Sequence, residues 1–150
     1  MDGLFIRNAL EVHAPIQMLW KVLTSNDFIP QYMFGCVAET DWKPGSPLLW
    51  KGAADGKLYV KGNVVSVDAP HRLEYTIIDP NNPAIPDVPE NYLTMVYILG
   101  ARDGGTALEI VQGDFSKVAN GPQRYQDSLG GGDFILQAIK KLAENQPSKG

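Results

Sequence analysis

The N-terminal part of the chain alternates between apolar and polar positions and then changes period. In residues 3–12, Ile6, Leu10 and Val12 fall on one side of the alternation and Arg7 on the other. A two-residue period places successive side chains on opposite faces of a strand. This stretch therefore predicts a first strand with one wetter face.

Helical spacing follows this strand. Ile16, Leu19 and Leu23 recur at intervals of three or four residues behind Pro15, a residue suited to a first helical turn. Thr24, Ser25 and Asn26 can cap a second helical piece through residue 28, which the proline at position 30 should interrupt. Two short helices are therefore expected after strand one.

The middle of the chain predicts further antiparallel strands. Runs rich in β-branched and aromatic residues are separated by turn signals such as Asp103-Gly104-Gly105. Prolines recur through residues 80–89, which predicts a long loop because proline lacks the N–H that a sheet needs. With the first strand, about six or seven strands are expected, and the clearest later ones span 48–52, 58–67, 72–78, 92–99 and 106–115.

The last element is predicted to be a long helix from about residue 120 to Glu144, ended by Pro147. Ile135, Ile139 and Leu142 form its apolar stripe. The run of three glycines at 130–132 is costly inside a helix, by about 1 kcal/mol per residue relative to alanine. Either the helix breaks there, or the missing side chains allow the sheet or a bound molecule to come close.

Composition is that of one ordinary α+β domain covering residues 1–150. Hydrophobic residues make up 44% and charged residues 20% of the chain, and the net charge is −4 without a basic block. Nucleic acid and anionic membranes attract basic surfaces, so neither is expected as a partner. No run approaches the roughly 20 apolar residues of a membrane span, which argues against membrane insertion.

Cysteine usage indicates the cellular compartment. Cys36 is the only cysteine, so the chain cannot form an internal disulfide, whereas small secreted domains usually carry several. Residues 1–10 lack the continuous hydrophobic core of a signal peptide. A cytoplasmic location is therefore predicted.

Local motifs resemble a known superfamily across essentially the whole chain. They are GSPLLW at 45–50, YVKGNVV at 59–65, PHRLEYT at 70–76 and GGTALEI at 104–110. These segments are similar to the START-like (SRPBCC, Bet v 1-like) superfamily, and within it to homologues of the activator of the heat-shock protein 90 ATPase. The resemblance implies a helix-grip fold, in which a curved antiparallel sheet wraps around the long C-terminal helix.

The resemblance also implies a cavity between sheet and helix that holds a lipid or another small apolar molecule. Strand alternation and helix spacing select the side chains that would face it, mostly apolar with a few polar groups. The candidate ligand-binding residues are Trp50, Tyr75, Met95, Tyr97, Ile110, Gln112, Gly131 and Ile135. A filled core is the competing explanation for the aromatic members of this set.

Candidates for chemistry are few. His13 and His71 fall at a strand end and in a turn, and Cys36 has no cationic sequence neighbour to activate its thiol. Asp114 and Asp133 can approach the cavity, but turn or helix-surface carboxylates explain both. No spacing of metal ligands and no phosphate loop is present in the sequence. We therefore expect no catalytic residue, no metal and no cofactor.

Three functions remain open at this point. The first is noncatalytic binding of a small apolar or amphipathic molecule. In this case Arg124 and Tyr125 would hold the molecule at the cavity mouth, although an ordinary exposed arginine explains Arg124 equally well. The second is a cyclase- or dehydratase-like enzyme that uses pocket tyrosines or Asp114. The third is a stress-response role with a chaperone as protein partner, and the chain is expected to be a monomer or weak dimer.

Overall fold

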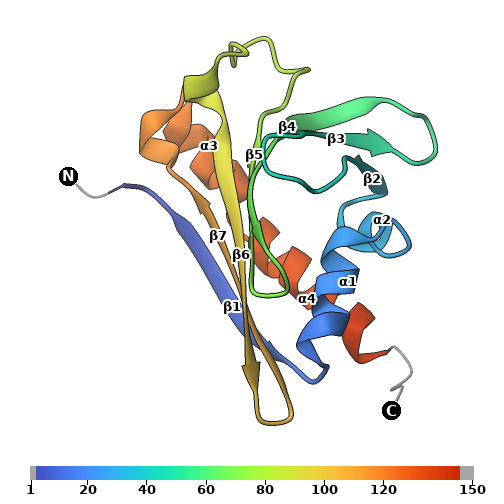
Figure 1. Cartoon of the computed structure of the whole chain (residues 1–150). Coiled ribbons are helices and arrows are strands. Elements are labelled where there is room, and N and C mark those ends of the chain that lie inside the picture. Colours follow the sequence, from blue (N-terminus) through green and yellow to red (C-terminus); the bar gives the residue numbers. More distant parts are fainter. Residues whose placement is uncertain (1–2, 146–150) are drawn as a thin grey trace.

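The computed structural model describes residues 3–145, and its centre is one curved antiparallel sheet (Figure 1). The sheet has seven strands in the order β1-β7-β6-β5-β4-β3-β2. Strands β2 to β7 are neighbours in the sheet in the order of the sequence, and the predicted long proline-rich loop joins β5 to β6. The strands are β1 (Ile6–Val12), β2 (Cys36–Glu39), β3 (Pro47–Gly52), β4 (Leu58–Asp68), β5 (Arg72–Ile77), β6 (Leu93–Arg102) and β7 (Gly105–Gly113).

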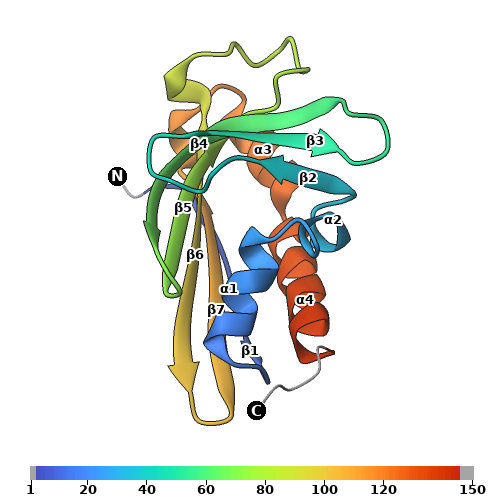
Figure 2. The same cartoon turned by 45° about the vertical axis from the view of Figure 1, so that its right-hand side comes forward.

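The helices lie on the concave side of the sheet. Figure 2 shows α1 (Ile16–Thr24) and α4 (Gly131–Glu144) side by side there, and α4 packs against β1, β7 and α1. The remaining helices are α2 (Ile29–Tyr32), α3 (Gly121–Ser128) and the 3-10 turns η1 (Pro89–Asn91) and η2 (Phe115–Lys117). The predicted α+β helix-grip fold is confirmed.

Three details differ from the sequence-based expectation. Pro30 does not interrupt a helix but sits in the first turn of α2, where its missing N–H has no helical partner to lose. Strand β2 was not predicted, because its four residues are too few to show a clear period. Pro147, expected to end the last helix, lies outside the described residues.

The long C-terminal helix is divided at the glycine run. Helix α3 ends before Leu129, which has extended backbone, and Gly130 adopts φ +86° ahead of α4. Glycine reaches this left-handed region without the clash that a Cβ causes. Of the two possibilities left open for the glycines, the break therefore occurs, although Gly132 also lies close to the sheet.

The main core fills the space between the concave face and helices α1 and α4. Alternate residues of β3, β5, β6 and β7 point into it, as the two-residue period predicts. Leu19 from α1 and Ile139 from α4 are fully buried against them. A smaller cluster of Ile6, Leu93 and Phe115 lies at the end of the sheet near η2.

No helix within residues 3–145 is long and apolar enough to cross a bilayer.

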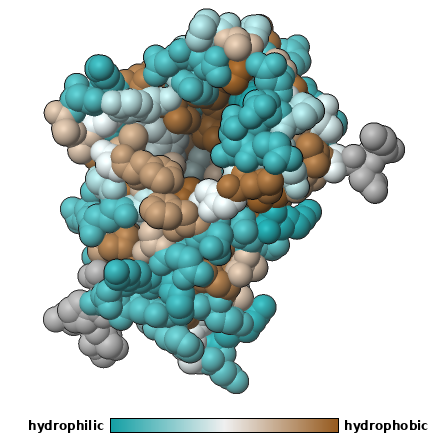
Figure 3. Space-filling view, turned by 180° about the vertical axis from the view of Figure 1, so that it is seen from behind, coloured by the Kyte–Doolittle hydropathy of each residue, from teal (hydrophilic) through white to brown (hydrophobic). Residues whose placement is uncertain are grey.

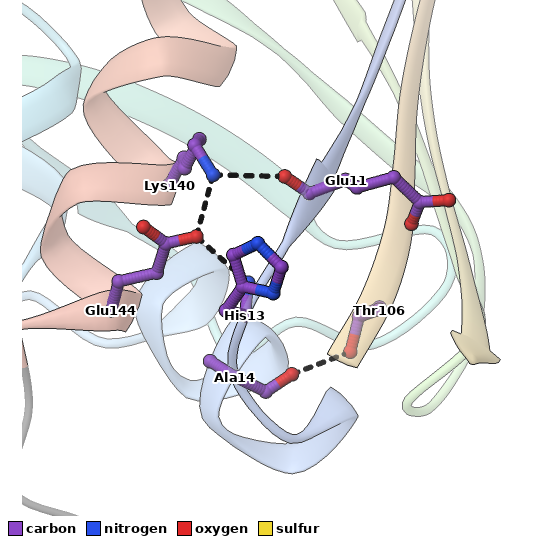
Figure 4. Close-up of polar contacts among 6 residues, drawn as sticks. All are labelled: Glu11, His13, Ala14, Thr106, Lys140 and Glu144. Carbon is purple, nitrogen blue, oxygen red and sulfur yellow. Dashed lines mark hydrogen bonds and ion pairs between the residues drawn. The ribbon is translucent and has the colours of Figure 1, made fainter. Parts of the chain in front are cut away.

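Polar contacts hold the C-terminal end of α4 to the corner between β1 and α1 (Figure 4). The Glu144 Oε2 atom accepts hydrogen bonds from the His13 backbone N–H at 2.7 Å and from Lys140 Nζ at 2.6 Å. Lys140 Nζ also donates to the Glu11 carbonyl oxygen at 3.1 Å. The hydrogen bond from His13 is the main cause of the lowered pKa of Glu144, and Lys140 adds to it.

Candidate functional site

A largely apolar pocket of about 540 Å³ opens where the β3–β4 end of the sheet faces the start of α4. Figure 3 shows a hollow with hydrophobic side chains on the face turned away from the viewer in Figure 1. A volume of this size suits a small organic molecule. The pocket is lined by Met33, Phe34, Gly35, Cys36, Trp50, Gly52, Ala54, Asp55, Tyr59 and Val60.

Trp50 forms the inner end of this pocket. Its side chain is only 1% exposed, whereas the other lining residues are half-buried or exposed. The indole Nε1–H is buried and has no hydrogen-bond partner among the described residues. Buried donors are nearly always paired, and leaving one unpaired costs about 1–3 kcal/mol. A residue of the pocket lining thus carries a buried donor that has no acceptor within residues 3–145.

An aromatic row continues from Trp50 into the core. The Trp50 and Tyr75 rings are 5.7 Å apart between centroids, and the Tyr75 and Tyr97 rings are 6.1 Å apart. The two tyrosine hydroxyls are 3.5 Å apart. Burial raises the pKa of Tyr75 well above its usual range and that of Tyr97 to about 12. Both hydroxyls are therefore protonated at neutral pH and cannot act as bases.

Two stacked phenylalanines form one side of the pocket mouth. Phe34 and Phe134 are 69% and 56% exposed, and their rings stack 5.3 Å apart with an angle of 12° between planes. Phe34, a lining residue, comes from the turn before β2, and Phe134 comes from the first turn of α4. The stack therefore joins the pocket lining to α4. An aromatic pair contributes about 0.5–1.5 kcal/mol beyond its buried area, which makes this contact easy to break.

Tyr59 and Asp55 form a hydrogen-bonded pair at the rim of the pocket. The Tyr59 hydroxyl donates a short hydrogen bond to the Asp55 carboxylate, which also accepts from the Lys57 backbone N–H at 3.0 Å. The bond from Tyr59 is the first cause of the lowered pKa of Asp55. Asp55 is therefore ionised at neutral pH and gives the rim a negative charge.

Cys36 lies in the pocket wall and is half-buried. Burial, followed by the charge of Asp55, raises the pKa of its thiol. Thiolate is the nucleophilic form, so a raised pKa lowers reactivity. This agrees with the expectation of an inert thiol.

The eight predicted ligand-binding residues divide between pocket and core. Trp50 lines the pocket, and Gly131 faces open space at the start of α4. Gln112 is 8% exposed, and its Nε2 atom lies beside Gly132 and close to Asn8. The other five are buried on the concave face or on α4 facing it, namely Tyr75, Met95, Tyr97, Ile110 and Ile135.

Sequence reasoning missed the residues of the rim. Tyr59 on β4 was not among the predicted residues, and it is 42% exposed. A register shift between Trp50 and Lys51 disturbs the β3–β4 pairing beside Tyr59, and such bulges redirect neighbouring side chains.

The remaining candidates have structural partners. The Asp114 carboxylate accepts hydrogen bonds from the backbone N–H groups of Leu4 and Ser116 and from the Ser116 hydroxyl, which lower its pKa. The Arg124 guanidinium donates to the Asn91 carbonyl oxygen at 3.0 Å, and burial lowers its pKa. Tyr125 packs edge-on against the Phe115 ring, in the smaller core cluster.

Neither histidine lies in the pocket lining. His13 and His71 are exposed at the β1–α1 corner and in the β4–β5 turn. Among residues 3–145, no three His, Cys, Asp or Glu side chains are grouped closely enough to hold a metal ion.

Comparison with known proteins places this geometry in a family. Residues 13–144 match the family described as "Activator of Hsp90 ATPase homolog 1-like protein", and the chain belongs to that family. The resemblance drawn from the sequence motifs is confirmed. A search of curated proteins found no match.

Solved structures share the fold over nearly the whole chain. The solution structure of ChR145 from Cytophaga hutchinsonii has 31% identity and a TM-score of 0.73, with 97% of each chain covered. A protein from Mesorhizobium loti has 17% identity and a TM-score of 0.77, covering 96% of this chain and 99% of its own. An HSP90 activator from Plasmodium falciparum has 15% identity and a TM-score of 0.66, covering 93% and 96%.

Proposed function

We propose that the chain binds a small apolar or amphipathic molecule without catalysing a reaction. The observation that carries the proposal is the apolar pocket that leads inward to the buried Trp50. Pockets of this volume with few polar groups are typical of small-molecule sites. In this proposal the ligand contacts Trp50 at the inner end of the pocket, and the other predicted residues form the concave face behind Trp50.

The polar groups around the pocket support a noncatalytic role. The buried tyrosines remain protonated at neutral pH. The Asp114 carboxylate accepts a hydrogen bond from the Ser116 backbone N–H in η2. General acid–base catalysis needs a group whose pKa lies near the working pH. The rim carboxylate of Asp55 has a lowered pKa instead.

Binding can be tested by blocking the pocket. Nile red, a neutral apolar dye, is titrated into the protein and into the variants Ala54→Trp and Ala101→Trp. Both alanines are exposed, but only Ala54 lines the pocket. We expect saturable binding that Ala54→Trp weakens at least tenfold, an effect of about 1.4 kcal/mol, and that Ala101→Trp leaves unchanged. Absence of saturable binding, or equal binding by both variants, would contradict the proposal.

A chaperone-associated role is a second candidate, supported by the family to which the chain belongs. It predicts heat of binding when the protein is titrated with a chaperone of the heat-shock protein 90 class in a calorimeter. A flat titration at micromolar concentrations, with a known activator giving heat in parallel, would reject this candidate.

A further inference from the structure

Several hydrogen-bonding groups of the pocket lining already have partners. The backbone N–H groups of Gly35, Cys36 and Gly52 donate to the carbonyl oxygens of Pro30, Met33 and Lys57 at 2.9–3.0 Å. The Tyr59 hydroxyl donates to Asp55 on the rim. Against this background the Trp50 indole is the strong side-chain donor of the lining that has no acceptor among the described residues.

Indole can only donate a hydrogen bond, so the group that completes it must be an acceptor. A buried donor of this kind calls for an explanation, because no group within residues 3–145 offsets its desolvation. The position of Trp50 at the inner end of an apolar pocket supplies one. A ligand that fills the pocket can bring the acceptor with it.

The charge of the lining indicates which acceptors fit. Asp55 is the charged residue of the lining, and its lowered pKa keeps it ionised. No lysine or arginine belongs to the lining, and the neighbouring Lys57 lies outside it. A carboxylate or phosphate in this pocket would lose hydration and meet a like charge. An uncharged oxygen, as in a ketone, ester or amide, avoids both costs.

We propose that the pocket selects neutral apolar molecules that carry one carbonyl-type acceptor, and that the Trp50 indole N–H binds this acceptor. This inference rests on the proposed function and names the class of its ligand. Anionic amphiphiles such as fatty acids are excluded by the same argument.

The stacked pair at the mouth provides the way in. The Trp50 Nε1 atom is shielded from solvent, so the ligand must displace part of the wall to reach it. Phe34 is well placed to move, because it is largely exposed and its φ of +56° lies in the left-handed region that non-glycine residues rarely occupy. Separation of its ring from Phe134 widens the mouth and leaves the core residues in place.

The test compares three probes of matched shape. 2-Acetylnaphthalene offers a neutral carbonyl, 2-ethylnaphthalene has no acceptor, and 2-naphthoate carries a carboxylate. Binding is followed by the three indole N–H resonances in ¹⁵N–¹H spectra, of which Trp20 and Trp42 serve as internal references. The variant Trp50→Phe assigns the third resonance, and Trp42→Phe is the matched control.

We expect the ketone to bind about tenfold more tightly than the hydrocarbon, the gain of one net hydrogen bond. The ketone should move the Trp50 resonance downfield and leave those of Trp20 and Trp42 in place, and the carboxylate should bind most weakly. In Trp50→Phe the advantage of the ketone over the hydrocarbon should vanish, whereas Trp42→Phe should retain it.

Failures of the two proposals give different results. If no probe binds, the proposed function itself fails. If ketone and hydrocarbon bind equally, or the carboxylate binds best, the pocket binds ligands but the inference about their class is overturned. If Trp50→Phe does not fold, the response of the Trp50 resonance in the unaltered protein still decides between these outcomes.

Discussion

The two ends of helix α4 are built in opposite ways. At the C-terminal end, the Glu144 carboxylate and the Lys140 ammonium tie the helix to the β1–α1 corner through hydrogen bonds of 2.6–3.1 Å. At the N-terminal end, Gly130 provides no side-chain cap and Phe134 is 56% exposed. The C-terminal end is thus held by side-chain hydrogen bonds, whereas the N-terminal end has no side-chain cap and is held by the burial of Ile135 and Leu136.

This contrast shows how one helix can serve both stability and binding. Ile139 and Ala143, toward the C-terminal end, are buried in the main core. Local stability follows such burial, and mobile regions are those with few buried contacts. We therefore expect substitutions of the buried residues of α4 to change the free energy of unfolding, and substitutions of the exposed Phe134, near the pocket, to act mainly on the pocket.

The largest difference is expected between Ile139→Ala and Phe134→Ala. Ile139 is 0% exposed, so its truncation leaves a cavity and should lower the free energy of unfolding by about 3 kcal/mol. Phe134→Ala removes one surface stack and should cost about 0.5 kcal/mol. Urea unfolding measures the loss of unfolding free energy in both variants. Equal losses would contradict the expected difference between the buried Ile139 and the exposed Phe134.

The glycine run should respond with opposite signs at adjacent positions. Gly130→Ala places a Cβ at φ +86° and should destabilise the protein by about 1 kcal/mol. Gly131 has a non-positive φ and open space around its Cβ position, so Gly131→Ala should stabilise by about 0.5–1 kcal/mol. Thermal unfolding of both variants checks this, and a loss in both would mean that the break at Gly130 is misplaced.

Acid should weaken the hydrogen bonds of Glu144 at the C-terminal end of α4. The folded-state pKa of Glu144 lies below its ordinary value of 4.5, so its stabilisation is present above that value and is lost as pH falls through the folded-state pKa. Glu144→Gln should therefore cost about 1 kcal/mol at pH 7 and progressively less below pH 4.5.

The matched control for this prediction is Glu11→Gln. Glu11 contributes its backbone carbonyl to Lys140, and its carboxylate points away from the contact (Figure 4). Urea unfolding from pH 7 to pH 3 should show no comparable loss in this variant. A Glu144→Gln deficit that stays constant over the whole range would contradict the assigned role of the charge.

The smallest effect is expected at the opening of the pocket. Phe34→Leu keeps an apolar side chain but removes the stack on Phe134, so unfolding should change by less than about 0.5 kcal/mol. Nile red should nevertheless associate and dissociate faster in stopped-flow mixing, because the wall opens more readily. Unchanged rates would show that this stack does not control access.

Much of the fold could be predicted from local patterns. Two-residue alternation correctly placed Tyr75, Met95 and Tyr97 on the concave face, and helical spacing correctly placed Ile135 and Ile139. Such predictions succeed because the side-chain direction in a strand or helix depends on the backbone period alone. Strand β2 and the role of Pro30 escaped because segments this short have no period to read.

The candidate site was predictable only in part, for the same physical reason. Trp50 could be found because it points inward from a regular strand, but Phe34 and Tyr59 belong to a turn and to a strand next to a register shift. Their positions depend on how distant segments pack. That packing leaves no local trace in the order of residues.

By itself, the sequence determined that a curved sheet would hold a C-terminal helix and that glycines would mark a special point along it. Only the tertiary structure decided that the helix breaks at Gly130 and that Phe34 meets Phe134 across about one hundred residues. It also decided that the Trp50 indole finds no acceptor within residues 3–145. Periodicity is set by the backbone of one segment, whereas a hydrogen bond that is not made depends on every segment around it.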